Sequence, residues 1–153
     1  MRTKWTDQFV NTAKSKGLEV KILNRVRGWI ETIEINGKRC YCRSMTYNKN
    51  REEYFIGVDP KKLKENGKFV CFCGGSDSTL RDIFLIPWDL FFEAINKGKA
   101  INTYKPPKEY WQYKVHLRNR NQKWVLSVQG GSNPKLNVGK WRFDVEKAIR
   151  TLN

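Results

Sequence analysis

The sequence predicts an α/β fold in which helices flank a central mixed β-sheet, followed by a C-terminal β-hairpin and helix. Three observations carry this prediction: helical spacing of apolar residues over 6–16, the dipeptide Asn36-Gly37, and a continuous apolar run over Phe69–Cys73. An Asn-Gly dipeptide tolerates the positive φ angles of a tight hairpin turn, so it marks two antiparallel strands. A run that is apolar at every position suits a strand covered on both faces.

A helix followed by strands opens the chain. Apolar residues recur on one face of the helix over 6–16, and Gly17 ends it. Alternation of apolar and polar residues then predicts two strands, or one bent strand, over 18–35 and a returning strand over 38–46. A further β-like run covers 54–58, and the next stretch is a basic connector.

The middle of the chain combines a buried strand with a second helix. The apolar run over 69–73 is interrupted by Gly74-Gly75, which we expect to break the strand, and the apolar pattern resumes over 82–86. Pro87 then starts a helix over 88–96, because proline is well tolerated at the first position of a helix.

The last third begins after a Pro-containing spacer over 105–108. Strands over 110–117 and 123–128 form a second predicted hairpin around the polar segment 118–121. Asp144 is a suitable N-cap for a terminal helix that runs to Leu152.

Length and charge bound the function. The chain has 153 residues, with 30 Lys and Arg against 15 Asp and Glu and a formal net charge of +15. We expect one domain over 1–153, with an alternative subdivision into a core over 1–104 and a basic extension over 105–153. A charge excess of this size opposes compaction unless an anionic partner shares the surface. We therefore expect a nucleic acid as the partner, DNA foremost and RNA as the alternative, against the competing interpretation of a Lys-rich protein without such a partner.

A membrane partner is not expected. No apolar run reaches the roughly 20 residues that span a bilayer, and no signal segment opens the chain. These two features together predict a cytoplasmic protein.

The order of elements is similar to that of a known superfamily. The similarity lies between about Thr6 and Asn96, and the segments that carry it are Ile35–Ser44, Tyr54–Val58, Phe69–Cys73 and Ile83–Pro87. A helix, strands, a hairpin, a buried strand and an Ile-Pro helix start in this order resemble the restriction-endonuclease-like PD-(D/E)xK nuclease superfamily. The resemblance implies a nuclease-like sheet, double-stranded DNA as the partner and a link to restriction and modification.

The chain departs from this superfamily where catalysis would lie. In the family, acidic residues hold a divalent metal and a lysine positions or activates the attacking water. Here the E-x-K positions fall on Tyr41 and Arg43, and the earlier Asp position falls on Thr32, with Glu31 and Glu34 as neighbours. Because tyrosine does not replace a carboxylate as a ligand for a hard cation, we expect a nuclease-like scaffold without a standard Mg²⁺ site and without a cofactor.

An active, metal-dependent endonuclease is the alternative. Its Mg²⁺ would be held by a relocated set of carboxylates drawn from Glu19, Glu31, Glu34 and Asp59. Such an enzyme would cleave DNA only when the divalent metal is present.

Four cysteines occur as two C-x-C pairs. They are Cys40 with Cys42 and Cys71 with Cys73. Both cysteines of such a pair point to one face of a strand, while Tyr41 and Arg43 point to the other. We expect buried, reduced thiols in the core, and a structural Zn²⁺ site formed by all four is the alternative.

Two groups of basic residues are candidate nucleic-acid contacts, because cations neutralise phosphates and nearby aromatic rings can stack on bases. The alternation over 113–118 places the single histidine of the first group on a polar face. The first group is Lys114, His116, Arg118, Arg120, Lys123, Trp124, Lys135, Lys140 and Arg142. The second group is Arg39, Arg43, Lys49 and Arg51.

Overall fold

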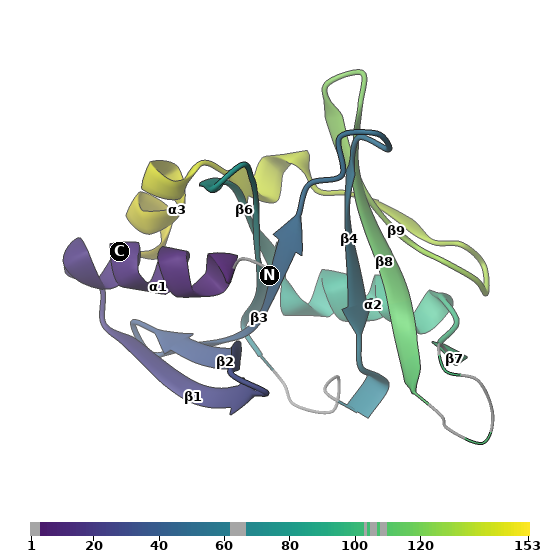
Figure 1. The fold of residues 1–153 in the computed structure, drawn as a ribbon, viewed down its shortest axis with the longest axis horizontal. Coiled ribbons are helices and arrows are strands. Elements are labelled where there is room, and N and C mark those ends of the chain that lie inside the picture. Colours follow the sequence, from purple (N-terminus) through teal and green to yellow (C-terminus); the bar gives the residue numbers. More distant parts are fainter. Residues whose placement is uncertain (1–3, 62–66, 103, 105–106, 108–109) are drawn as a thin grey trace.

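The computed structural model describes residues 4–61, 67–102, 104, 107 and 110–153, and it contains two β-sheets and three α-helices (Figure 1). Most of the basic connector after β4 and most of the predicted spacer over 105–108 lie outside the described residues. The fold is α/β with mixed strand directions and a C-terminal strand and helix, as the sequence predicts.

The first sheet has six strands and is mixed. β3 and β5 are parallel, and every other neighbouring pair is antiparallel. In spatial order its strands are β1 (Val20–Val26), β2 (Trp29–Ile35), β3 (Lys38–Thr46), β5 (Phe69–Ser76), β6 (Thr79–Pro87) and β11 (Arg142–Phe143). The predicted turn between β2 and β3 is confirmed, since Asn36 and Gly37 have φ angles of 48° and 81°.

Two helices cover one face of this sheet. α1 (Trp5–Ser15) packs on the central strands, and α3 (Val145–Leu152) packs on β6 and β11 (Figure 1). The predicted cap of α3 is confirmed, because Asp144 accepts a hydrogen bond of 2.8 Å from the backbone N–H of Lys147. In the part of the chain that the structure describes, no helix has both the length and the apolar character that a membrane span requires.

A second sheet faces the other side of the first. Its strands in spatial order are β10 (Lys135–Asn137), β9 (Lys123–Val128), β8 (Trp111–Arg120) and β4 (Glu53–Val58), and β7 (Ile101–Asn102) pairs with β8. The sequence predicts one central sheet, with the run over 54–58 inside the nuclease-like core. The structure pairs that run with β8 instead, because strand periodicity does not reveal which distant strand will be the partner.

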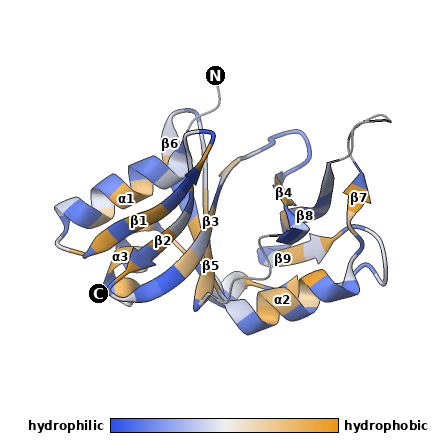
Figure 2. Cartoon of the chain, turned by 90° about the horizontal axis from the view of Figure 1, so that it is seen from below, coloured by the Kyte–Doolittle hydropathy of each residue, from blue (hydrophilic) through white to orange (hydrophobic). Residues whose placement is uncertain are grey.

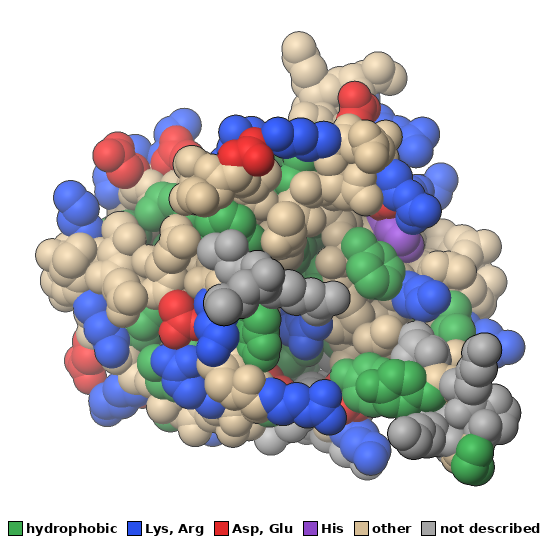
Figure 3. Space-filling model, in the orientation of Figure 1, with side chains coloured by type: hydrophobic (Ala, Val, Ile, Leu, Met, Phe, Trp, Pro, Cys, Tyr) green, Lys and Arg blue, Asp and Glu red, His purple; other side chains and the backbone are tan. Residues whose placement is uncertain are grey.

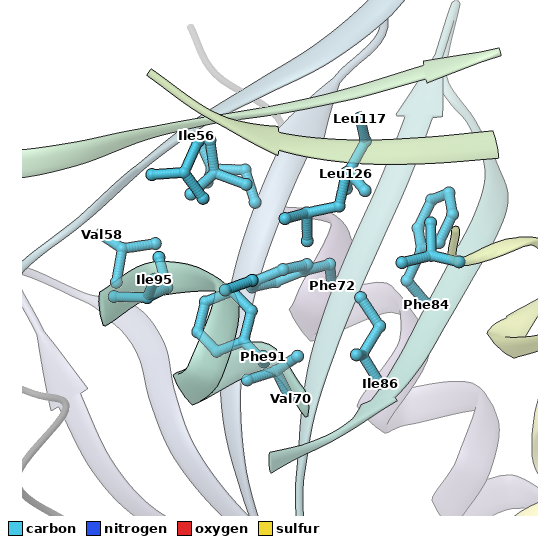
Figure 4. Close-up of a cluster of buried hydrophobic side chains, with 14 of the residues drawn as sticks. Ile56, Val58, Val70, Phe72, Phe84, Ile86, Phe91, Ile95, Leu117 and Leu126 are labelled. Carbon is cyan, nitrogen blue, oxygen red and sulfur yellow. The ribbon is translucent and has the colours of Figure 1, made fainter. Parts of the chain in front are cut away.

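The main core lies between the two sheets and is closed below by α2 (Trp88–Lys97) (Figure 2). Figure 4 shows Ile56 and Leu117 from the second sheet opposite Phe72 and Ile86 from the first, with Phe91 of α2 beside them. β5 therefore has apolar neighbours on both faces, as the continuous apolar run predicts.

The prediction that Gly74-Gly75 breaks the strand is wrong, because both glycines lie within β5. A Cβ on Gly74 would lie 2.5 Å from the ring of Tyr54, and a Cβ on Gly75 would lie 2.9 Å from the ring of Trp5. The missing side chains let one large ring approach each face of the strand. The turn comes later, at Asp77 and Ser78, which have positive φ angles.

The second hairpin also turns later than predicted. β8 continues to Arg120, and the turn residues are Asn121 and Gln122, with φ angles of 52° and 64°. The strands therefore include much of the polar segment 118–121, which brings its cations onto the sheet. A short 3₁₀ turn, η2 (Gly139–Trp141), then connects β10 to β11.

Candidate nucleic-acid interface

The second sheet has one buried and one open face. On β4, Tyr54, Ile56 and Val58 are buried against the core, whereas Phe55 lies on the opposite side and is 45% exposed. Directly paired residues of neighbouring strands share a face, so the pairing of Phe55 with His116 places that histidine on the open side. We call this side the outer face.

Five cations share the outer face by strand register. Arg118 pairs with Glu53, and Arg120 pairs with Lys123. Lys135 pairs with Ser127, and Ser127 in turn pairs with His116. The cations are Lys114, Arg118, Arg120, Lys123 and Lys135.

Among the described strands of the second sheet, Glu53 is the one acidic residue that could balance these cations. From Tyr110 to Phe143 the sequence holds no Asp or Glu at all. Figure 3 shows blue side chains around the purple histidine over the second sheet, whereas red and blue side chains are mixed over the first. The outer face of the second sheet therefore carries a local excess of positive charge.

Glu53 is the carboxylate that these strand pairings place on the outer face, and it is fully engaged. Its Oε2 accepts hydrogen bonds of 2.8 Å from both Nδ1 of His116 and Nε of Arg118. Its side chain is 2% exposed, against 37% for Arg118. Burial opposes ionisation, but the hydrogen bonds and charges of Arg118 and His116 outweigh it and lower the pKa of Glu53 below its ordinary value. The ionised carboxylate thus holds two basic side chains in place.

An aromatic ring lies on the edge strand β4, beside this basic surface. The rings of Phe55 and His116 are 5.1 Å apart between centroids, with an interplanar angle of 54°. His116 is mostly covered, with a side chain 13% exposed, so Phe55 is the ring that solvent reaches. An exposed ring on the same sheet face as several cations is a combination that nucleic-acid-binding sheets use to stack on bases.

Three residues of the first predicted group lie elsewhere. Trp124 points into the core side and stacks on Tyr54, with ring centroids 5.9 Å apart. Lys140 lies over the ring of Trp141, at 4.6 Å from the centroid. Arg142 on β11 donates a hydrogen bond of 2.6 Å to Asp82. These side chains are therefore not part of the outer face.

The second predicted group does not form one surface. Lys49 is engaged in an ion pair with Asp77 at 2.6 Å, and Arg51 is exposed in the turn before β4. Arg39 pairs in register with Glu34 on β2, and Arg43 is half-buried further along β3. The group is therefore divided between β3 of the first sheet and the turn segment before β4.

The degenerate catalytic positions share one side of the first sheet. Thr32 lies directly opposite Tyr41, and alternation puts Glu34 and Arg43 on the same side. Tyr41 is buried, which raises its pKa; Arg43 lowers that pKa, and the charges of Glu31 and Asp59 raise it. A tyrosine held in its neutral form does not act as a metal ligand.

No carboxylate cluster accompanies Tyr41. Glu31 accepts a hydrogen bond of 3.1 Å from Asn24, and Glu19 lies near Lys21 at the start of β1. Over the described ranges, no three His, Cys, Asp or Glu side chains are grouped as a metal ion would require. The relocated site of the active-nuclease alternative therefore lacks a ligand set among these residues.

The four cysteines are free and buried, which confirms the expectation of buried thiols. They face α1 and α3, on the side of the first sheet opposite Tyr41, as strand alternation predicts. Sγ of Cys71 and Sγ of Cys73 are 3.8 Å apart. Burial raises the pKa of Cys40, Cys42 and Cys73, so these thiols stay protonated.

Comparison of the chain with protein-family models, curated proteins and solved structures found no match. The resemblance to the restriction-endonuclease-like superfamily therefore stays a prediction, and the outer face has to be interpreted from its own chemistry.

Sequence reasoning missed Phe55 and Glu53. The run Tyr54-Phe55-Ile56 is apolar at every position, so it carries no signal for which side chain faces solvent. The alternation of Lys114, His116 and Arg118 was a visible signal, and its register with β4 is what brings Glu53 and Phe55 beside these residues.

Proposed function

We propose that this protein binds nucleic acid through the outer face of the second sheet. The observation that carries the proposal is the set of five cations that share the outer face with the exposed ring of Phe55, where the carboxylate placed by the strand pairings is already bound to His116 and Arg118. A polyanion would neutralise this surface and release the counterions that otherwise accompany it.

The spacing of the cations suits a linear chain of phosphates. Lys114, Arg118 and Arg120 lie along β8, and residues two positions apart on one face of a strand are separated by about 7 Å. Lys123 and Lys135 extend the surface across β9 and β10. Affinity would come from phosphate contacts, which are independent of sequence.

Phe55 favours a strand with unpaired bases. A side chain on the open face of a sheet stacks only on a base that is not covered by its neighbours in a duplex. Double-stranded DNA, which the superfamily resemblance implies, would contact the cations but would not stack on the ring of Phe55. We therefore expect single-stranded nucleic acid to bind more tightly than a duplex of equal length.

Fluorescence anisotropy with labelled single-stranded DNA, single-stranded RNA and duplex DNA tests the proposal. We expect the logarithm of affinity to fall linearly with the logarithm of salt concentration, with a slope of about 3 to 5 for five cations. Lys114→Ala should reduce this slope by about 1. The control is Lys21→Ala, which removes an exposed cation from β1 on the first sheet and should leave the slope unchanged.

Two results would contradict the proposal. One is the absence of binding to any of the three ligands at about 50 mM salt, where phosphate contacts are strong. The other is an equal loss of affinity in Lys114→Ala and Lys21→Ala, which would mean that charge acts without a defined surface.

A further inference from the structure

A polar pocket lies beside the turn between β8 and β9, on the side of the second sheet that faces away from the outer face. Its volume is about 660 Å³, within the range of sites that hold small molecules. The side chains that matter for its chemistry are Tyr47, Arg81, Asn119, Gln122, Trp124 and Arg142.

The base of the pocket is a fully engaged carboxylate. Asp82 is 5% exposed, and its Oδ2 accepts a hydrogen bond of 2.5 Å from the hydroxyl of Tyr54. Its Oδ1 accepts one of 2.6 Å from Nε of Arg142. Asp82 therefore compensates the charge of Arg142 and keeps the ring of Tyr54 in place, and Trp124 stacks on that ring with an interplanar angle of 22°.

Arg81 is a cation without a partner in the pocket wall. On β5 and β6, Gly74 pairs with Asp82 and the next residue, Gly75, pairs with Leu80. Arg81 has no partner in this register and is the extra residue of a β-bulge. A bulge re-aims side chains, and here it lets Arg81 and Asp82, neighbours in sequence, both line the pocket. Arg81 makes no hydrogen bond or ion pair with the residues that the structure describes, so the lining carries one uncompensated positive charge.

Asn119 offers an unused acceptor. Its Oδ1 is buried and has no hydrogen-bond partner among the described residues, although it lines the pocket. A buried acceptor without a partner is unfavourable, and a rotation of the amide toward the pocket would let a ligand N–H satisfy it. Gln122 contributes a second amide to the same wall.

We infer that this pocket binds one nucleotide unit. Its base would lie against Trp124 and donate an N–H to Asn119, and its phosphate would lie near Arg81. A nucleotide combines the three properties that the lining selects: a planar ring, an N–H donor and a negative charge. The inference does not require the outer face to bind nucleic acid, because a free mononucleotide would satisfy the same contacts.

The place of the pocket allows a second source for the nucleotide. Asn119 alternates along β8 with Arg118 and Arg120, so the pocket and the outer face meet at the turn between β8 and β9. A strand held on the outer face could turn one base around this edge and into the pocket.

Calorimetric titration of the whole protein with AMP, adenosine and ribose 5-phosphate tests the pocket. AMP should bind, adenosine more weakly because it lacks the phosphate, and ribose 5-phosphate more weakly because it lacks the base. Arg81→Gln should lower the affinity for AMP about tenfold while leaving that for adenosine unchanged, as expected for one charge contact. Asn119→Leu should lower both affinities without destabilising the fold, because it removes an acceptor that has no partner. Arg150→Gln, which changes an exposed arginine on α3, is the matched control.

A second arm identifies the source of the nucleotide. The fluorescence of 2-aminopurine in an oligonucleotide changes when that base moves from the nucleic-acid stack into a protein pocket. If AMP does not bind but the fluorescence changes with the native protein and not with Asn119→Leu, the pocket takes a base from a bound strand. The inference is overturned if AMP does not bind and the fluorescence change is absent or equal in the two proteins. It is also overturned if AMP binds equally to the native protein, Arg81→Gln and Asn119→Leu.

The experiments distinguish a failure of the pocket inference from a failure of the proposed binding at the outer face. Loss of oligonucleotide binding in the anisotropy experiment contradicts the outer face, while the AMP titration still decides the pocket. Conversely, Arg81→Gln and Asn119→Leu should keep the salt slope for oligonucleotides within about 1 of the native value.

Discussion

The two sheets differ in how many of their faces are buried. The first has α1 and α3 on one face and the second sheet with α2 on the other, so most of its central residues are occupied in packing. The second buries only the face that carries Ile56 and Leu117 and leaves the other to solvent. Strand register places five cations and one carboxylate on that open face. The difference teaches that the sheet face which the core does not need is the one that stays available for contacts with other molecules.

Two phenylalanines provide the sharpest test of this comparison. Phe72 on β5 is completely buried between the sheets, and Phe55 on β4 is 45% exposed. Phe72→Ala should lower the free energy of unfolding by about 3 to 5 kcal/mol, because it removes contacts on all sides and leaves a cavity. Phe55→Ala should change it by no more than about 0.5 kcal/mol. Urea denaturation measures both, and equal losses would contradict the assignment of buried and open faces.

Replacing Glu53 tests whether the carboxylate on the outer face contributes to the stability of the fold. Glu53→Gln should lower the free energy of unfolding by about 1.5 to 3 kcal/mol, because a buried acceptor of two charged hydrogen bonds loses its charge. Affinity for an oligonucleotide should not fall, since the positive charge of the face increases. Asp77→Asn is the control, because it changes an exposed ion pair with Lys49 and should leave stability almost unchanged. A parallel loss of stability and affinity in Glu53→Gln would instead make Glu53 part of the binding surface.

Phe55 should matter for binding rather than for folding. Phe55→Ala should weaken binding of a single-stranded oligonucleotide by about 5- to 150-fold, which corresponds to about 1 to 3 kcal/mol for one stacked base. Phe55→Trp should retain binding, because any large ring can stack. Leu23→Ala, which removes an exposed apolar side chain from β1, serves as the control. Anisotropy measures all three, and an unchanged affinity in Phe55→Ala would remove the ring from the proposed interface.

The pH dependence of stability gives the smallest expected effect. The pKa of Glu53 is lower in the folded than in the unfolded chain, where it is about 4.3. Its contribution is therefore complete above about pH 4.3 and is lost as the pH falls through the folded-state pKa. The difference in unfolding free energy between the native protein and Glu53→Gln should shrink below that pH. Denaturation curves at pH 7, 5 and 3.5 measure it, and a constant difference would mean that Glu53 is not the titrating group.

Local elements were predictable where neighbouring residues decide them. The strand over 38–46, the turn at Asn36-Gly37 and the cap at Asp144 all match the structure. Gly74-Gly75 was misinterpreted, because a glycine pair indicates a turn locally but here makes room for rings from elsewhere in the chain. Trp124 is expected from the sequence to be a nucleic-acid contact, but strand alternation turns it toward Tyr54, away from Arg118.

The candidate site was predictable only in part. The alternating cations of β8 were identified from the sequence, but Glu53 and Phe55 were not. Glu53 and His116 are 63 positions apart in the chain, and neither segment contains a sequence signal that predicts their contact. Arg81 was equally hidden, because the bulge that aims it depends on how β5 pairs with β6.

Composition and short-range pattern alone determined that this protein has a net charge of +15, an α/β arrangement and a buried strand over 69–73. Charge is a sum over residues, and periodicity is a property of neighbours, so neither depends on the fold. The second sheet, its open face and the polar pocket came only with the tertiary structure. Each of them requires strands that are distant in sequence to pair in one register, and that register is selected by burial of the whole core rather than by either strand.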